Sequence, residues 1–169
     1  SGKPGFHCVT LWSIYGVPMR FLLYNLRYGT GERRFLLPWS GYFRRTEHNL
    51  RDITEFMSSL DPDIVGLLEV DAGSYRTGRR NQAQDLAEAL GHYHTYRCKY
   101  SESGMTRFLP LFNKQGNAFL ARDTIANEHF HYFEKGMKRL VIEMDLENVT
   151  IFLVHLALSF RVRQHQLGD

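Results

Sequence analysis

Cysteine is scarce in this chain, which contains only Cys8 and Cys98. Neither belongs to a C-x-x-C pair, so the sequence indicates neither a zinc knuckle nor a framework of disulfides. A chain with so little cysteine chemistry is typical of a reducing compartment, and we predict a cytoplasmic location.

Long apolar runs are also missing from the sequence. No stretch is long enough to cross a bilayer, and residues 1–18 have a single lysine and no clear cleavage site for a signal peptidase. We interpret residues 1–18 as a leader that is either flexible or foreign to the natural chain. Residues 19–169 then form one domain, since no internal repeat or shift in composition marks a boundary.

A strong excess of charge of one sign is absent as well. The 21 basic and 18 acidic residues give a formal net charge of +3, which is too small to predict a polyanionic partner by itself. In contrast, 43% of the residues are hydrophobic and 14% are aromatic, which indicates a globular domain with a sizeable core.

The most informative stretch is Asp61–Asp71, D-P-D-I-V-G-L-L-E-V-D. Its short apolar run follows a Pro-containing break and is apolar on both faces, which favours a central strand. Glu69 comes at the end of this run, where a carboxylate can hold a divalent cation. The alternative is that Glu69 is only the first solvated residue after the strand.

The residues before this stretch predict a strand, a helix and a second strand. An apolar strand at Arg20–Asn25 is followed by a long loop, Arg27–Tyr42, and by an amphipathic helix that Thr46 caps and Pro62 ends. With the strand Ile64–Glu69 this order is a βαβ unit, whose two strands are neighbours. The polar residues that end both strands should therefore lie at the same edge of the sheet.

The second half of the chain is rich in strands. A helix at Ala83–Leu90, closed by Gly91, precedes a strand-like segment at His92–Lys99. We predict that the rest is an antiparallel meander whose last strand ends in the polar residue His155. Its strands are Gln115–Arg122, Ile125–Phe133, Arg139–Leu146 and Val149–Leu156.

Four segments resemble, in the right order, motifs of the endonuclease/exonuclease/phosphatase superfamily, also called deoxyribonuclease-I-like. They are Y-N-L-R-Y-G at Tyr24–Gly29, D-P-D-I-V-G-L-L-E-V at Asp61–Val70, Q-G-N-A-F-L-A-R at Gln115–Arg122 and V-H-L-A-L-S-F-R-V-R-Q-H-Q-L at Val154–Leu167. The resemblance implies an α+β fold, a four-layer α/β/β/α sandwich with mixed β-sheets. It also implies hydrolysis of phosphate esters with bound Mg²⁺, for which Mn²⁺ can substitute.

The resemblance also implies roles for single residues. Glu69 matches the metal ligand, Asn25 matches an asparagine that positions the metal-bound network, and His155 matches a histidine that contacts the scissile phosphate, although Val154 replaces the usual threonine before it. The structural alternatives are that Asn25 caps a turn and that His155 is a hydrogen-bonded core imidazole.

Further residues of the matched segments are candidates for substrate binding. They are Arg27, Asn117 and Arg163. Arg163 also forms an R-x-x-Q pattern with Gln166, on the helix that follows the last strand, and this pattern favours a structural role.

Two motifs of the superfamily are missing from the sequence. The G-D-x-N strand end and the S-D-H that supplies the general base are not found, and Gly168-Asp169 comes too soon after His155 to be the former. We therefore expect the chain to be the N-terminal portion of the domain, with the C-terminal portion missing, and to be inactive by itself.

The substrate and a second function class remain open in the sequence. The substrate could be a nucleic acid, a lipid head group or a small phosphodiester, since each presents a phosphate ester. The alternative to an enzyme is a non-catalytic binding or assembly module built on the same half-fold. No stable protein partner is indicated, but an exposed sheet edge would allow self-association of such a chain.

Overall fold

The structure is a computed structural model that describes residues 6–12, 18–27, 47–74, 77–98, 114–134, 140–157 and 159–168. Most of the predicted loop Arg27–Tyr42 and the predicted cap Thr46 lie outside the described residues. The described part forms two sheets and three helices. Their elements are β1 (Phe6–Trp12), β2 (Pro18–Asn25), α1 (Glu47–Leu60), β3 (Ile64–Asp71), α2 (Gln82–Leu90), β4 (Tyr93–Cys98), β5 (Gln115–Ala121), β6 (Asn127–Tyr132), β7 (Leu140–Asp145), β8 (Thr150–Val154) and α3 (Phe160–Gln166).

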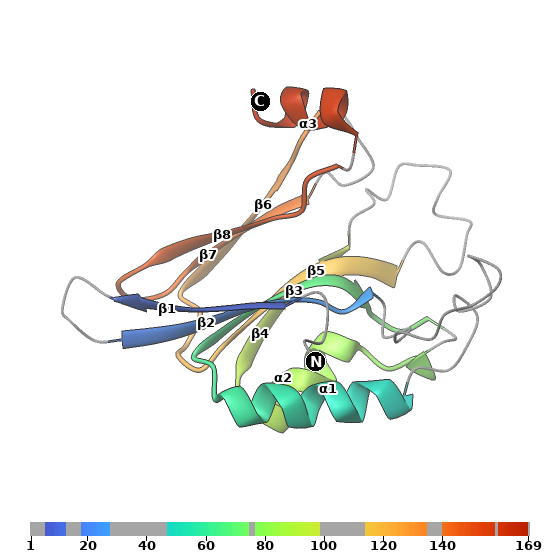
Figure 1. Cartoon of the computed structure of the whole chain (residues 1–169), viewed down its shortest axis with the longest axis vertical. Coiled ribbons are helices and arrows are strands. Elements are labelled where there is room, and N and C mark those ends of the chain that lie inside the picture. The colour runs from blue at the N-terminus through green and yellow to red at the C-terminus, as the bar shows by residue number, and fades with distance from the viewer. Residues whose placement is uncertain are drawn as a thin grey trace.

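The first sheet has the strand order β1-β2-β3-β5-β4 (Figure 1). β2 and β3 pair in parallel, so the predicted βαβ unit is confirmed. The other pairings of this sheet are antiparallel. β3 and β5 lie in its centre and are buried along almost their whole length, because apolar side chains cover both of their faces.

Residues 6–12 form a strand that the sequence analysis did not predict. They pair with β2 as the edge strand β1, from Phe6 opposite Tyr24 to Trp12 opposite Pro18. The sequence F-H-C-V-T-L-W is rich in aromatic and β-branched residues, which favour strands. Val9 and Cys8 are both exposed on this edge strand. The segment therefore shows no alternation of buried and exposed residues from which a strand could have been predicted.

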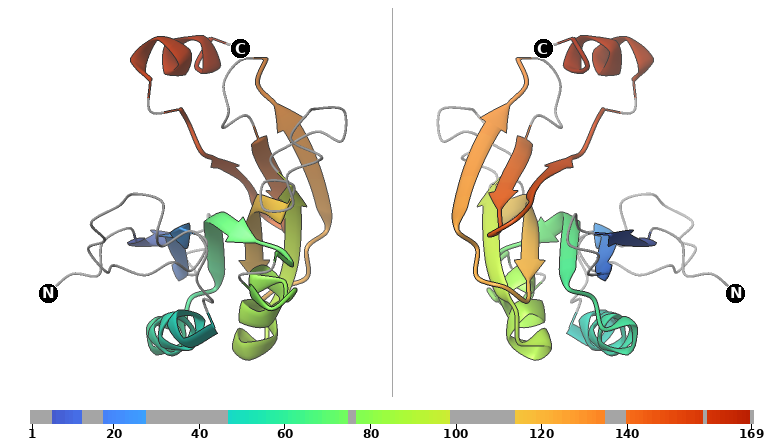
Figure 2. Two further views of the ribbon diagram at one scale, coloured as in Figure 1. Left: turned by 90° about the vertical axis from the view of Figure 1, so that its right-hand side faces the viewer. Right: turned by 90° about the vertical axis from the view of Figure 1, so that its left-hand side faces the viewer.

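The helices α1 and α2 cover one face of the first sheet (Figure 2). α2 is well delimited: the side chain of Asn81 accepts a hydrogen bond from the Ala83 N–H, and Gly91 ends the helix with φ of 68°. The core on this face joins residues of both helices, such as Met57 and Leu86, to the sheet. No helix of the described residues combines the length and the apolar character that crossing a membrane requires.

The second sheet has the order β6-β7-β8 and packs on the other face of the first. Its three strands form the predicted antiparallel meander. The prediction was wrong for β5, which pairs with β3 and β4 in the first sheet. Its side chains are buried on both faces, because one face packs toward the helices and the other toward the second sheet. Residues such as Phe119 and Ile142 fill the space between the sheets.

The described residues therefore stack as helices, sheet and sheet, which confirms the α+β class and agrees with part of the predicted four-layer sandwich with mixed sheets. Of the two sheets, the first is mixed and the second is antiparallel. The short helix α3 lies beyond one end of the second sheet in all views, not over its outer face (Figures 1 and 2). β3 and β8 end on the same side of the interface between the two sheets. Glu69 and His155, which were predicted from the sequence as site residues, lie there.

Candidate functional site

Glu69 lies at an irregularity in β3. The pairing of β3 with β5 shifts between Leu67 and Val70, so that Leu68 and Glu69 both oppose Asn117. Glu69 has φ of 55°, a left-handed conformation that is rare for a residue with a side chain. Strained backbone of this kind often occurs at functional sites, where a bulge redirects a side chain. Here the redirected side chain is a carboxylate that is 17% exposed.

Asn117 supports the bulge from the neighbouring strand. Its side chain is 1% exposed, and its Oδ1 accepts a long hydrogen bond of 3.4 Å from the Glu69 N–H. Its Nδ2 is buried and has no hydrogen-bond partner among the described residues. A buried amide donor without a partner is costly, so it marks a position where a ligand oxygen can bind.

His155 comes from the second sheet, directly after β8. Its Nε2 lies 3.8 Å from Glu69 Oε1, and the two side chains are 12% and 17% exposed. This distance is too long for a hydrogen bond but allows an ion pair when the imidazole is protonated. The end of β3 and the end of β8 thus bring a carboxylate and an imidazole together across the two sheets.

Asn25 ends β2 and lies beside Leu68 in the parallel register. It is therefore at the same edge of the sheet as Glu69, as the βαβ pattern predicted. Its Oδ1 accepts a hydrogen bond of 3.0 Å from the Arg27 N–H, and Arg27 has a left-handed φ of 46°. Asn25 thus holds the turn after β2, which is the structural alternative considered for it, and one part of its amide is committed to that turn.

Arg163 and Gln166 hold the segment that follows His155. Arg163 donates a 3.0 Å hydrogen bond to the Ala157 carbonyl, and Gln166 accepts a 2.9 Å hydrogen bond from the Ala157 N–H. Both contacts support the structural role of the R-x-x-Q pattern more than a contact of Arg163 with substrate. Arg27, the remaining candidate for substrate binding, is exposed at the end of β2.

Two residues near the site were not found from the sequence. Asp71 is fully buried, and its carboxylate accepts hydrogen bonds from the Ser74 N–H at 2.9 Å and the Ser74 hydroxyl at 2.5 Å. Arg97 lies opposite Asn117 in the β4–β5 register, and its guanidinium stacks 4.9 Å above the ring of Phe130. A signal for Asp71 existed, because an acidic residue two positions after Glu69 is unexpected in a buried strand.

The donor groups near Glu69 fit a hard divalent cation. Among the described side chains they are a partly buried carboxylate, amide groups and an imidazole, which suit a hard ion. Mg²⁺ is often bound by one or two carboxylates and keeps several of its waters, so Glu69 together with substrate oxygens is a sufficient ligand set.

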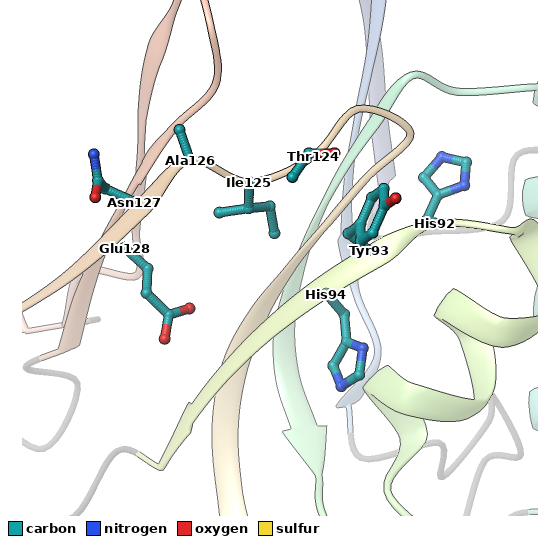
Figure 3. A pocket seen from close by; sticks show the side chains of 8 residues that line it. All are labelled: His92, Tyr93, His94, Thr124, Ile125, Ala126, Asn127 and Glu128. Carbon is teal, nitrogen blue, oxygen red and sulfur yellow. The ribbon is translucent and has the colours of Figure 1, made fainter.

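A pocket of about 460 Å³ lies elsewhere in the molecule (Figure 3). Its residues come from the start of β4 and from the segment after β5, whereas Glu69 lies beside the beginning of β5. The pocket and the Glu69 site are therefore at opposite ends of the first sheet. The lining residues are His92, Tyr93, His94, Thr124, Ile125, Ala126, Asn127 and Glu128.

Three solved structures share the fold. An endonuclease/exonuclease/phosphatase family protein from Leptotrichia buccalis C-1013-b is 14% identical, with a TM-score of 0.56 over 89% of this chain and 60% of that chain. D. rerio TDP2, humanized by 14 mutations, is 13% identical, with a TM-score of 0.51 over 87% of this chain and 51% of that chain. ANGEL2, a 2',3'-cyclic phosphatase, is 15% identical, with a TM-score of 0.61 over 99% of this chain and 49% of that chain. The chain thus spans about half to three fifths of the length of these proteins.

Comparison of sequences gives the family. No curated protein matches the chain in a sequence search. The family model described as Endonuclease/Exonuclease/phosphatase family matches residues 22–166, a range that begins in β2 and ends at the last residue of α3. This range includes the end of β3 with its bulge and the end of β8 with His155. The chain therefore belongs to the endonuclease/exonuclease/phosphatase family.

Proposed function

We propose that this chain is part of a divalent-metal-dependent hydrolase of phosphate esters, in which Glu69 binds the metal and His155 contacts the phosphate. The family assignment supports the class of reaction. The observation that carries the proposal for the residues is the 3.8 Å separation of Glu69 Oε1 and His155 Nε2, at a bulge where Glu69 has left-handed backbone.

The chemistry of the residues agrees with this reaction. A bound Mg²⁺ or Mn²⁺ supplies positive charge that stabilises the charge developing on a phosphoryl group. The protonated imidazole of His155 can donate a hydrogen bond to a phosphate oxygen, and Asn117 Nδ2 offers a second, buried donor beside Glu69. Asn25, at the neighbouring strand end, orients the groups around the carboxylate.

The 169 residues lack the motifs that supply a general base for the attacking water. Neither G-D-x-N nor S-D-H occurs in the 169 residues. We infer that these residues by themselves bind the metal and hold one side of the phosphate, and that they hydrolyse esters at most very slowly.

The substrate is proposed only as a phosphate ester. Nucleic acid, a lipid head group and a small phosphodiester all present the same phosphoryl oxygens to Glu69, His155 and Asn117. A generic diester such as bis(p-nitrophenyl) phosphate therefore tests the reaction without a choice among them.

Binding of Mg²⁺ is the first test of the proposal. A ligand at ten times its dissociation constant stabilises the folded state by about 1.4 kcal/mol. This corresponds to a rise of about 4 °C in the melting temperature of a domain of this size. Glu69→Gln should abolish the rise, whereas Glu55→Gln, on the exposed face of α1, should keep it. A rise that persists in Glu69→Gln would overturn the role of Glu69.

Hydrolysis is the second test, in the natural protein that contains this domain. Glu69→Ala should lower the rate of diester hydrolysis by roughly a thousandfold, because the metal would lose its carboxylate ligand. Glu55→Ala is the matched control. Undiminished hydrolysis by Glu69→Ala would contradict the assignment, and a chain that dimerises but binds no Mg²⁺ would favour the non-catalytic assembly module.

A further inference from the structure

The outer face of the second sheet carries a second group of potential metal ligands. Along β7 the side chains of Ile142 and Met144 enter the core between the sheets, so Glu143 and Asp145 face the other way. The register places His129 of β6 directly opposite Glu143. Two adjacent strands thus present an imidazole and two carboxylates on one face. Figure 1 shows that the sheet of β6, β7 and β8 lies on the side of the first sheet away from α1 and α2.

These three side chains are close enough to share one ion. One nitrogen of His129 and one carboxylate oxygen each of Glu143 and Asp145 all lie within 4.8 Å of one another. His129 is exposed and the two acidic side chains are half-buried, so the group is accessible from solvent. Because the ligands stand on paired strands, the backbone fixes their relative positions before any ion binds.

Neighbouring side chains orient both carboxylates. His131 Nε2 lies 2.5 Å from Glu143 Oε2, and Thr150 Oγ1 donates a 2.6 Å hydrogen bond to Asp145 Oδ1. Each contact uses one oxygen of the carboxylate and leaves the other for an ion. Such outer partners are a common feature of metal sites, where they fix the direction of the ligand.

Charge also favours a cation at this position. Glu143 and Asp145 are two residues apart on the same face of β7, so their charges repel each other. Among the described residues, the ion pair of His131 is with Glu143 and not with Asp145. A divalent cation would offset the charges of both carboxylates at once.

We propose that His129, Glu143 and Asp145 form a second metal site, for a divalent transition metal of the zinc class. An imidazole ligand favours Zn²⁺ over Mg²⁺ or Ca²⁺, which prefer oxygen ligands alone. The site is separate from Glu69, because Glu143 and Asp145 face away from the core between the sheets and Glu69 belongs to β3 of the first sheet. A bound ion would link the edge strand β6 to β7 and stabilise their pairing.

Zn²⁺ titration measured by isothermal calorimetry tests this proposal. The wild-type chain is expected to bind Zn²⁺, and both His129→Gln and Asp145→Asn should weaken this binding at least tenfold. Thr150→Val removes only the partner that orients Asp145, so a loss of roughly tenfold is expected. Replacing Zn²⁺ by Co²⁺ should give visible absorption bands that disappear in His129→Gln.

Two control variants separate this site from other Zn²⁺-binding positions. Glu69→Gln and His94→Gln, the latter at an exposed residue of β4, should leave the affinity of the outer site unchanged. The proposal is overturned if the wild-type chain fails to bind Zn²⁺, or if His129→Gln binds it as tightly as the wild type. It is also overturned if Glu69→Gln, and not His129→Gln, removes the binding.

Discussion

The imidazole Nε2 of His155 lies 3.8 Å from Glu69 Oε1, although Glu69 belongs to β3 of the first sheet and His155 follows β8 of the second. Their approach depends on how closely the sheets pack. Gly66 of β3 permits this packing, because a Cβ at its position would lie 3.1 Å from Leu153 Cδ1 of β8. The contact of Gly66 with Leu153 therefore contributes to the close packing of the two strands that carry the site.

Gly116→Ala should destabilise the domain strongly. A Cβ at this position would lie 2.1 Å from the Arg97 carbonyl oxygen of β4, and backbone of a paired strand cannot move without loss of its hydrogen bonds. We expect a loss of about 3 kcal/mol in the free energy of unfolding, measured by urea denaturation. In the control Gly66→Ala the close atoms belong to flexible side chains, so a loss of about 1 kcal/mol is expected. Equal losses in the two variants would contradict this explanation.

Glu69→Gly should be more stable than Glu69→Ala. Both variants lack the carboxylate, but the left-handed φ of 55° disfavours alanine and not glycine. The expected difference in the free energy of unfolding is about 1 kcal/mol, from chemical denaturation of the two variants side by side. If alanine proved equal to glycine, Glu69 would not hold this conformation in solution.

Gln166→Ala should loosen the segment after His155. The substitution removes a buried side chain that accepts the Ala157 N–H, and the expected loss is about 2 kcal/mol in thermal or urea unfolding. Gln164→Ala on the exposed side of α3 is the matched control and should change the stability by less than about 0.5 kcal/mol. A similar loss in both variants would mean that the hydrogen bond between Gln166 and Ala157 does not contribute to the stability of the domain.

Asp71→Ala should cost about 3 kcal/mol, because the Ser74 N–H and hydroxyl would both lose a buried acceptor. Urea denaturation measures this loss, and Glu55→Ala provides an exposed acidic residue for comparison. The metal affinity of the folded Asp71→Ala protein should stay close to that of the wild type, since Asp71 acts on the loop after β3. A large fall in Mg²⁺ affinity would instead make Asp71 part of the metal site.

Much of the fold could be predicted from local patterns in the sequence. The apolar run before Glu69 gave a buried strand, and the order strand, helix, strand gave the parallel pair β2–β3. Both patterns depend on residues that are near each other in the chain. The edge strand β1 was not predicted, because a strand that pairs on one side only and is exposed to solvent leaves no apolar pattern in the sequence.

The geometry of the candidate site was less predictable. The left-handed backbone of Glu69 depends on its pairing with Asn117, and the sequence does not specify this register. The cluster of His129, Glu143 and Asp145 also depends on strand register, which the sequence does not specify. Both strands were predicted, but only the register of β6 against β7 brings these three residues together.

The division of the site between two sheets links ligand binding to the dynamics of the domain. A ligand that contacts both Glu69 and His155 binds only while the second sheet stays packed on the first. Each opening of that interface must therefore release the ligand, and a bound ligand must slow the opening. Amide hydrogens of β8 should then exchange with solvent more slowly in the presence of a phosphate ester and metal, whereas those of β1, on the far edge, should not respond.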